Sequence, residues 1–121
     1  MSFKIDIQHF FSSLFDKCGF EFLDIGEDHG GNVLVARSKG LQVRFIHDRA
    51  DFFLELKPSD AENDWVDFYT ILDRLVGTHK LAVDFKHSNK MAHVGSTLKT
   101  VLVKRPDFFE LIEKSVFVER V

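Results

Sequence analysis

Four short apolar segments, separated by very short polar turns, occupy residues 20–57 of this 121-residue chain. The turns hold glycines or an Arg-Ala pair and are too short for a crossover connection. Consecutive strands joined in this way must lie antiparallel, so the pattern predicts a four-stranded meander. The expected strands are Phe20 to Ile25, Asn32 to Ser38, Leu41 to Asp48 and Asp51 to Lys57, with turns at 28–32, 39–40 and 49–50.

Helical periodicity dominates the chain on both sides of this meander. An apolar stripe from Phe3 to Cys18 recurs at helical spacing and predicts one N-terminal helix, stopped by Gly19, with Phe10 and Phe15 in the core. Three helices are expected after the sheet, with Pro106 in the first turn of the last one. Their apolar faces run from Trp65 to Val76, Met91 to Leu102 and Phe108 to Val116, and caps are expected at Asn63 or Asp64 and at Ser88 or Asn89.

Together these elements predict an α+β fold: an N-terminal helix, a four-stranded antiparallel meander, and three C-terminal helices packed on the sheet. Residues 1–121 are expected to form a single domain, because the length matches the usual domain size. The 14 Phe residues supply much of the apolar surface, and their periodic placement assigns most of them, together with Trp65, to the core.

The residue content argues against several kinds of functional site. A lone Cys18 excludes an intrachain disulfide and a multi-cysteine zinc site, and it favours a reducing cytoplasm. None of the six His residues lies three or four positions from another, so no helical metal pair is expected. The stretch from Gly95 to Lys99 lacks the spacing of a P-loop. We therefore expect no catalytic residue, metal or cofactor, and no signal peptide or membrane-spanning segment.

Charge is distributed unevenly along the chain, although its formal net value is only −3. Residues 50–76 hold seven acidic against two basic side chains, and residues 77–105 hold six basic against one acidic. The basic segment lacks interleaved aromatic residues apart from Phe85, so nucleic-acid binding is not expected. The two segments either neutralise each other, or the acidic one, with Asp60, Glu62 and Asp67, binds a basic protein partner.

One face of the predicted sheet is mixed in character. Arg44, Glu55 and Lys57 share it with Ile46 and Phe53, so either the C-terminal helices or another chain should cover part of it. One alternative is a self-associating structural protein that forms a homodimer through this face. The other is a small-ligand-binding or enzymatic domain with a pocket between sheet and helices, lined by Phe and His. The partner-binding candidates are Arg44, Asp48, Arg49, Asp51, Phe53, Asp60, Glu62 and Asp67, of which Asp48, Arg49 and Asp51 form either a solvated turn or a recognition tip.

The segment from Leu41 to Leu56 resembles the paired strands of small bacterial proteins with a helix, four strands and further helices. Some of those proteins resemble immunity proteins that neutralise polymorphic toxins. The resemblance covers residues 4–76 and depends on Arg44, Asp48, Arg49 and the pair Phe52-Phe53. The resemblance implies no catalytic residue. The absence of catalytic signatures and the uneven charge predict a non-enzymatic protein-binding domain, and the resemblance makes an immunity-type bacterial inhibitor its specific form.

Overall fold

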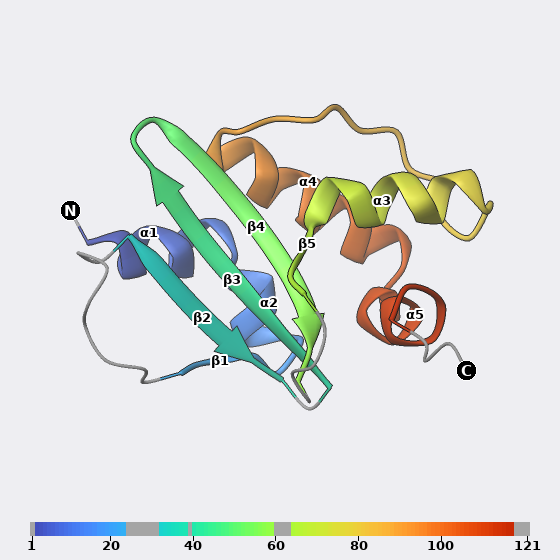
Figure 1. The fold of residues 1–121 in the computed structure, drawn as a ribbon, viewed down its shortest axis with the longest axis horizontal. Helices are drawn as coiled ribbons and strands as arrows, with labels where there is room; N and C mark the ends of the chain where they lie inside the picture. The colour runs from blue at the N-terminus through green and yellow to red at the C-terminus, as the bar shows by residue number, and fades with distance from the viewer. Residues whose placement is uncertain (1, 24–31, 39, 60–63, 118–121) are drawn as a thin grey trace.

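The computed structural model describes residues 2–23, 32–38, 40–59 and 64–117, which form a five-stranded antiparallel sheet and five helices (Figure 1). The strands lie in the sheet in chain order, so the predicted α+β class is confirmed. The elements are α1 (Phe3–Phe10), α2 (Ser12–Asp16), β1 (Glu21–Phe22), β2 (Val33–Arg37), β3 (Leu41–Asp48), β4 (Asp51–Pro58), β5 (Val66–Asp67), α3 (Phe68–Gly77), α4 (Met91–Lys104) and α5 (Phe108–Ser115).

The β3–β4 hairpin agrees closely with the sequence prediction. β3 has the predicted bounds, and β4 extends one residue further, to Pro58. Asp48 pairs with Asp51, which leaves a two-residue turn at 49–50. The first expected strand is present as β1, but its predicted end at Ile25 and the turn at 28–31 lie outside the described residues.

The prediction of four strands is wrong, because β5 adds a fifth strand along β4. Val66 pairs with Leu56 and Asp67 with Glu55. The next helix therefore begins at Phe68, later than expected, and Asp67 caps it by accepting a hydrogen bond from the backbone N–H of Tyr69 at 2.9 Å. A two-residue strand is too short to leave a periodic signal in the sequence, so only its pairing with β4 identifies it.

The N-terminal helix is also interrupted, at Phe11, which has a non-helical backbone conformation. The Phe11 ring lies 5.2 Å from the ring of Phe45 and 5.6 Å from that of Phe52, measured between centroids, and the residue is buried. Placing this ring against β3 and β4 turns Phe10 outward. Phe10 is consequently 37% exposed, so its assignment to the core is wrong, whereas Phe15 is half-buried and stacks on Phe22.

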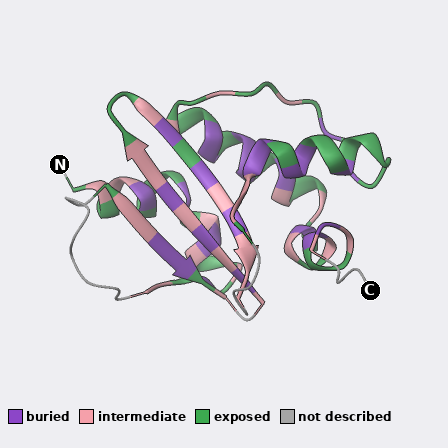
Figure 2. Cartoon of the chain, viewed as in Figure 1, coloured by how far each residue is buried: buried purple, intermediate pink, exposed green. Residues whose placement is uncertain are grey.

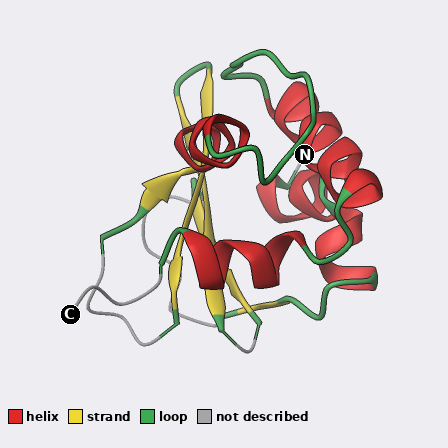
Figure 3. Ribbon diagram, turned by 90° about the vertical axis from the view of Figure 1, so that its right-hand side faces the viewer, coloured by secondary structure: helices red, strands yellow, loops and turns green. Residues whose placement is uncertain are grey.

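The helices form a layer on one side of the sheet. Seen edge-on, α1, α2 and α4 lie on that side, and α3 and α5 lie beside the β4–β5 edge (Figures 1 and 3). No described helix lies over the opposite face, which we call the open face (Figure 3). The expectation that the C-terminal helices cover this face is therefore wrong for the described part of the chain.

The buried apolar side chains form one cluster between the sheet and the helices (Figure 2). Alternate residues of β3 and β4 supply its floor, because side chains alternate between the two faces of a strand. Burial of these aromatic and aliphatic groups provides most of the driving force for folding. The sheet residues in the cluster are Ala36, Leu41, Val43, Phe45, Phe52, Leu54 and Leu56.

Candidate functional site

The open face displays the other half of the strand residues, and it mixes charged, polar and aromatic side chains. Its rows follow from the register: Val33 lies opposite Ile46 and Ile46 opposite Phe53, while Val35 lies opposite Arg44 and Arg44 opposite Glu55. These two rows give the face an apolar end and a charged centre. Both rows follow the sequence alternation that predicted a mixed face.

An ion pair and an aromatic ring form the centre of the open face. The Arg44 Nε donates to Glu55 Oε1 at 2.9 Å, and the Arg44 Nη2 donates to the same oxygen. The Arg44 guanidinium carbon lies 4.4 Å from the centroid of the Trp65 ring, and the Lys57 ammonium lies 5.0 Å from it. Cations at such distances are attracted to the electron-rich face of an indole ring. This cluster therefore holds three long side chains in one arrangement.

Trp65, like Phe10, was wrongly assigned to the core from the sequence. Its helical spacing to Phe68 and Tyr69 placed it in the core as part of a helix, but it lies immediately before β5 and outside any helix. The residue is half-buried and contacts cations of β3 and β4. Aromatic and Arg side chains of this kind are enriched at protein-binding hot spots. An Arg and a Lys facing the same side of a hairpin were the only sequence signal for this site.

The apolar end of the open face contains Phe53 and Ile46. Phe53, a partner-binding candidate predicted on the mixed face, is 38% exposed, and Ile46 beside it is half-buried. Val35, nearer the centre, is only 7% exposed. The face is thus well packed in the middle and presents an accessible aromatic ring at one end.

The hairpin tip has a strained backbone and one anchored side chain. Arg49 has φ 60°, a value that a residue with a side chain rarely adopts, and Arg49 and Asp48 are both exposed. Asp51, in contrast, accepts a hydrogen bond from Asn89 Nδ2 at 2.6 Å, and the Asn89 carbonyl accepts from the N–H of Phe52 at 2.8 Å. Asp51 therefore fastens the α3–α4 connection to β4, while Asp48 and Arg49 point to solvent.

The acidic segment does not form one surface in the described part of the chain. Asp67 caps α3, and Asp73 contacts the His87 ring, with Oδ2 to Nε2 at 3.1 Å. His87 also stacks on Tyr69, with 4.8 Å between ring centroids. Asp60 and Glu62 lie outside the described residues. Of the predicted acidic candidates in this segment, Asp67 thus has a structural role as the cap of α3, and it lies opposite Glu55 in the register.

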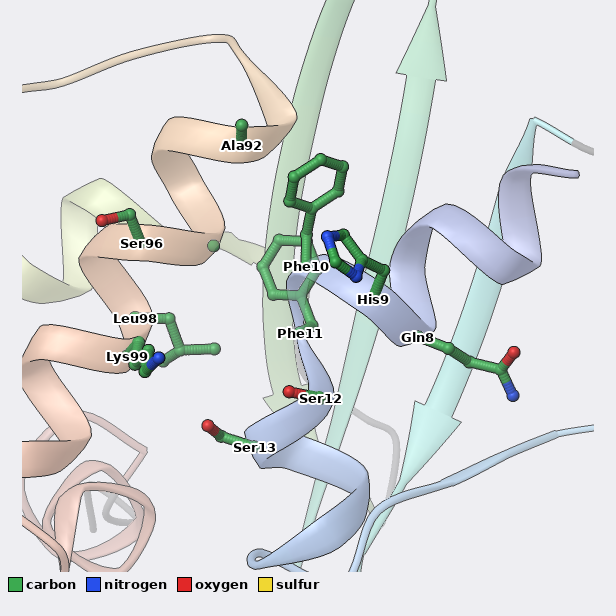
Figure 4. Close-up of a pocket in the computed structure, with 11 residues that line it drawn as sticks. Gln8, His9, Phe10, Phe11, Ser12, Ser13, Ala92, Ser96, Leu98 and Lys99 are labelled. Atoms are coloured by element: carbon green, nitrogen blue, oxygen red, sulfur yellow. The ribbon is translucent and has the colours of Figure 1, made fainter. Parts of the chain in front are cut away.

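A second feature lies in the helical layer, where a groove runs between the α1–α2 junction and α4 (Figure 4). It has a volume of about 570 Å³ and is lined from one side by His9, Phe10, Ser12 and Ser13 and from the other by Ser96 and Lys99. An adjoining hollow of about 340 Å³ shares Ser13 and Lys99 with it. The pocket predicted as an alternative was expected between sheet and helices. The groove observed here is lined by Phe and His residues, but it lies between helices.

Two buried or half-buried groups titrate abnormally. Burial raises the pKa of the Cys18 thiol, against the smaller opposing effect of Lys17, so the thiol is protonated at neutral pH. Burial also raises the pKa of Tyr69. Thr97 and the backbone of Ser88 lie near enough to its hydroxyl to oppose that shift, but neither reaches hydrogen-bonding geometry. Neither group carries the features of an activated nucleophile or base.

Within the described ranges no group of three His, Cys, Asp or Glu side chains is arranged to hold a metal ion. No helix of the described chain is long and apolar enough to cross a membrane. Comparisons with protein-family models, curated proteins and solved structures found no significant match to this chain.

Proposed function

We propose that this chain is a protein-binding domain without catalytic activity, and that the open face of its sheet is the binding surface. One observation carries the proposal: the preformed cluster of Trp65, Arg44, Glu55 and Lys57 beside the exposed Phe53. Rigid aromatic and arginine side chains bind partners strongly, because little side-chain entropy is lost when the complex forms.

The charges of the open face indicate the chemistry of the partner. Its basic side chains are Arg37, Arg44 and Lys57, and Arg44 is already paired with Glu55. Neither Arg37 nor Lys57 forms a salt bridge with a carboxylate among the described residues, although Glu21 lies opposite Arg37 and Asp67 opposite Glu55 in the register. Arg37 and Lys57 thus suit a partner that presents carboxylates to them and an apolar group to Phe53 at the apolar end, since complementary charge speeds association and excludes other proteins.

An immunity-type inhibitor is the more specific form of this proposal. Its support is the resemblance of residues 4–76, in which Arg44 and Phe53 also belong to the proposed surface. The partner would then be a toxin encoded beside this chain in its native genome. A toxin that binds the open face would present an acidic surface to it. A toxin that binds the acidic segment of this chain would instead present a basic surface.

The test uses the purified product of the neighbouring gene and two matched variants. Phe53 and Phe10 are 38% and 37% exposed, but they lie on opposite sides of the molecule's sheet. We expect Phe53→Glu to weaken binding by at least about ten-fold, and Phe10→Glu to leave it unchanged. Equal effects of the two variants would contradict the open face as the binding surface. A neighbouring product that neither binds nor is inhibited would contradict the immunity form.

Self-association through Phe53 and Ile46 is the competing function of the same face. A second copy on this face would bury the Arg44–Glu55 ion pairs of both chains, and the cost of removing these charges from water disfavours a symmetric dimer. We therefore expect a monomer in sedimentation at tens of micromolar. A dimer that Phe53→Glu dissociates would replace the hetero-partner proposal.

A further inference from the structure

The groove in the helical layer continues along α4 as a second, more apolar hollow. The two hollows meet at Ser13 of α2 and Lys99 of α4, which line both. The second hollow, of about 340 Å³, is completed by Lys17 and Cys18 after α2 and by Leu102, Val103 and Pro106 of α4 and its C-terminal end. Its volume lies in the range of small-molecule sites.

No aspartate or glutamate lines either hollow. The charged side chains are Lys99, on the wall formed by α4, and Lys17, on the wall formed by α2, and every remaining polar side chain can donate a hydrogen bond. This set is notable in a chain with a net charge of −3. Two lysine side chains that line one hollow together with Ser13 attract an anion and repel a cation.

The outer wall of the second hollow is apolar and accessible. Val103 is 73% exposed, more than any other exposed large hydrophobic side chain of the described residues, and it adjoins Leu102 and Pro106. Exposed apolar surface next to a hollow is stabilised when a hydrocarbon group covers it. Cys18 adds a neutral thiol and no competing negative charge.

Close packing of two helices preforms the groove. A Cβ atom on Gly95 of α4 would lie 2.5 Å from the backbone oxygen of Phe10, so only glycine allows α4 to approach the α1–α2 junction this closely. The walls are therefore held in position before a ligand arrives, which reduces the entropy lost on binding.

We propose that this groove binds a small organic anion with a hydrocarbon body, its charged group between Lys99, Lys17 and Ser13 and its hydrocarbon against Val103 and Leu102. Carboxylates and phosphate monoesters share this chemistry. The site does not depend on the open face, which lies on the other side of the sheet.

The test is an NMR titration of the full chain with octanoate, octyl phosphate, octanol and octylammonium. We expect both anions to shift the amide signals around Ser13, Lys99 and Val103 and to bind at least about ten-fold more tightly than octylammonium. Whichever anion binds more tightly identifies the head group. Equal binding of octylammonium, shifts elsewhere, or no binding of either anion at millimolar concentration would overturn the proposal.

Two pairs of variants separate the head-group contact from the hydrocarbon contact. Val103→Asp puts a carboxylate on the exposed wall, so octanoate binding should fall about ten-fold or more, whereas the isosteric Val103→Asn should lower it only a few-fold. Lys99→Gln should weaken octanoate but not octanol. Lys114→Gln, on α5 and outside both hollows, should leave both unchanged. Unaltered octanoate binding by Val103→Asp and Lys99→Gln would exclude this groove as the site.

Discussion

The two faces of the sheet are stabilised by different interactions, although alternate residues of the same strands, β3 and β4, form both faces. On the covered face, Phe45, Phe52 and their aliphatic neighbours are buried in one cluster with side chains of the helices. On the open face, Arg44, Glu55 and Phe53 alternate with them and are held by an ion pair, a cation–aromatic contact and partial burial. The covered face therefore carries stability, and the open face is free to carry recognition. Each prediction below tests that division.

The largest expected change in the free energy of unfolding comes from truncating a buried side chain of the covered face. Phe45→Ala should lower the free energy of unfolding by about 3–5 kcal/mol, because it leaves a cavity among Phe11, Phe22 and neighbouring side chains. Phe53→Ala, on the neighbouring strand but the open face, should change it by less than about 1 kcal/mol. Urea denaturation of both variants measures the difference. Similar losses would mean that the open face is also part of the folding core.

The next effect tests the close packing of the layer that covers the sheet. Gly95→Ala should destabilise the chain by about 1–3 kcal/mol, because the new Cβ would lie 2.5 Å from the Phe10 carbonyl oxygen. Gly77→Ala is the matched control, since nothing lies within 4 Å of a Cβ at this helix end. Thermal unfolding of the two variants should separate them. A neutral Gly95→Ala would show that α1 and α4 can move apart freely.

A smaller effect is expected at the centre of the open face. A double-mutant cycle with Arg44→Ala and Glu55→Ala should give a coupling energy of about 0.5–1 kcal/mol, the usual size for a partly exposed ion pair. Trp65 is the only tryptophan, so its fluorescence reports on this face alone. Arg44→Ala should shift its emission to longer wavelength as the ring gains solvent. An unchanged spectrum would contradict the contact between the guanidinium and the indole.

The smallest effect concerns an exposed ion pair in the helical layer. The Arg105 guanidinium, which donates to both carboxylate oxygens of Asp107, holds the pKa of Asp107 below its ordinary value of 3.8. A lowered folded-state pKa stabilises the fold above the unfolded-state value, and this contribution disappears as the pH falls through the folded-state value. Asp107→Asn should therefore be slightly less stable than the parent chain at pH 7 and equal to it at the lowest pH at which both remain folded. Asp64→Asn, at an exposed position, is the control for simple loss of charge.

The β3–β4 hairpin and the mixed character of its outer face could be predicted from the sequence, because a two-residue turn and strict alternation leave one register. The burial of Phe11 and the exposure of Phe10 could not be predicted. The two rings are neighbours in one helical stripe, and only the position of Phe45 and Phe52 decides which ring turns inward.

Trp65 and the groove could not be predicted for related reasons. Trp65 fits a helical pattern locally, and its position before β5 depends on the pairing of β5 with β4. Lys17 and Lys99 are far apart in sequence, and they line one hollow because α2 packs near α4. Long-range contacts have no local signature in a single chain.

By itself, the sequence determined the class of the fold, the antiparallel order of the strands and the alternation that separates a covered face from an open one. These are consequences of turn length and hydrophobic period, which act over a few residues. The tertiary structure decided which side chains of the helices are exposed, where the indole of Trp65 lies and which lysines line the same hollow. Those properties depend on packing between distant segments, where steric fit and register outweigh local preference.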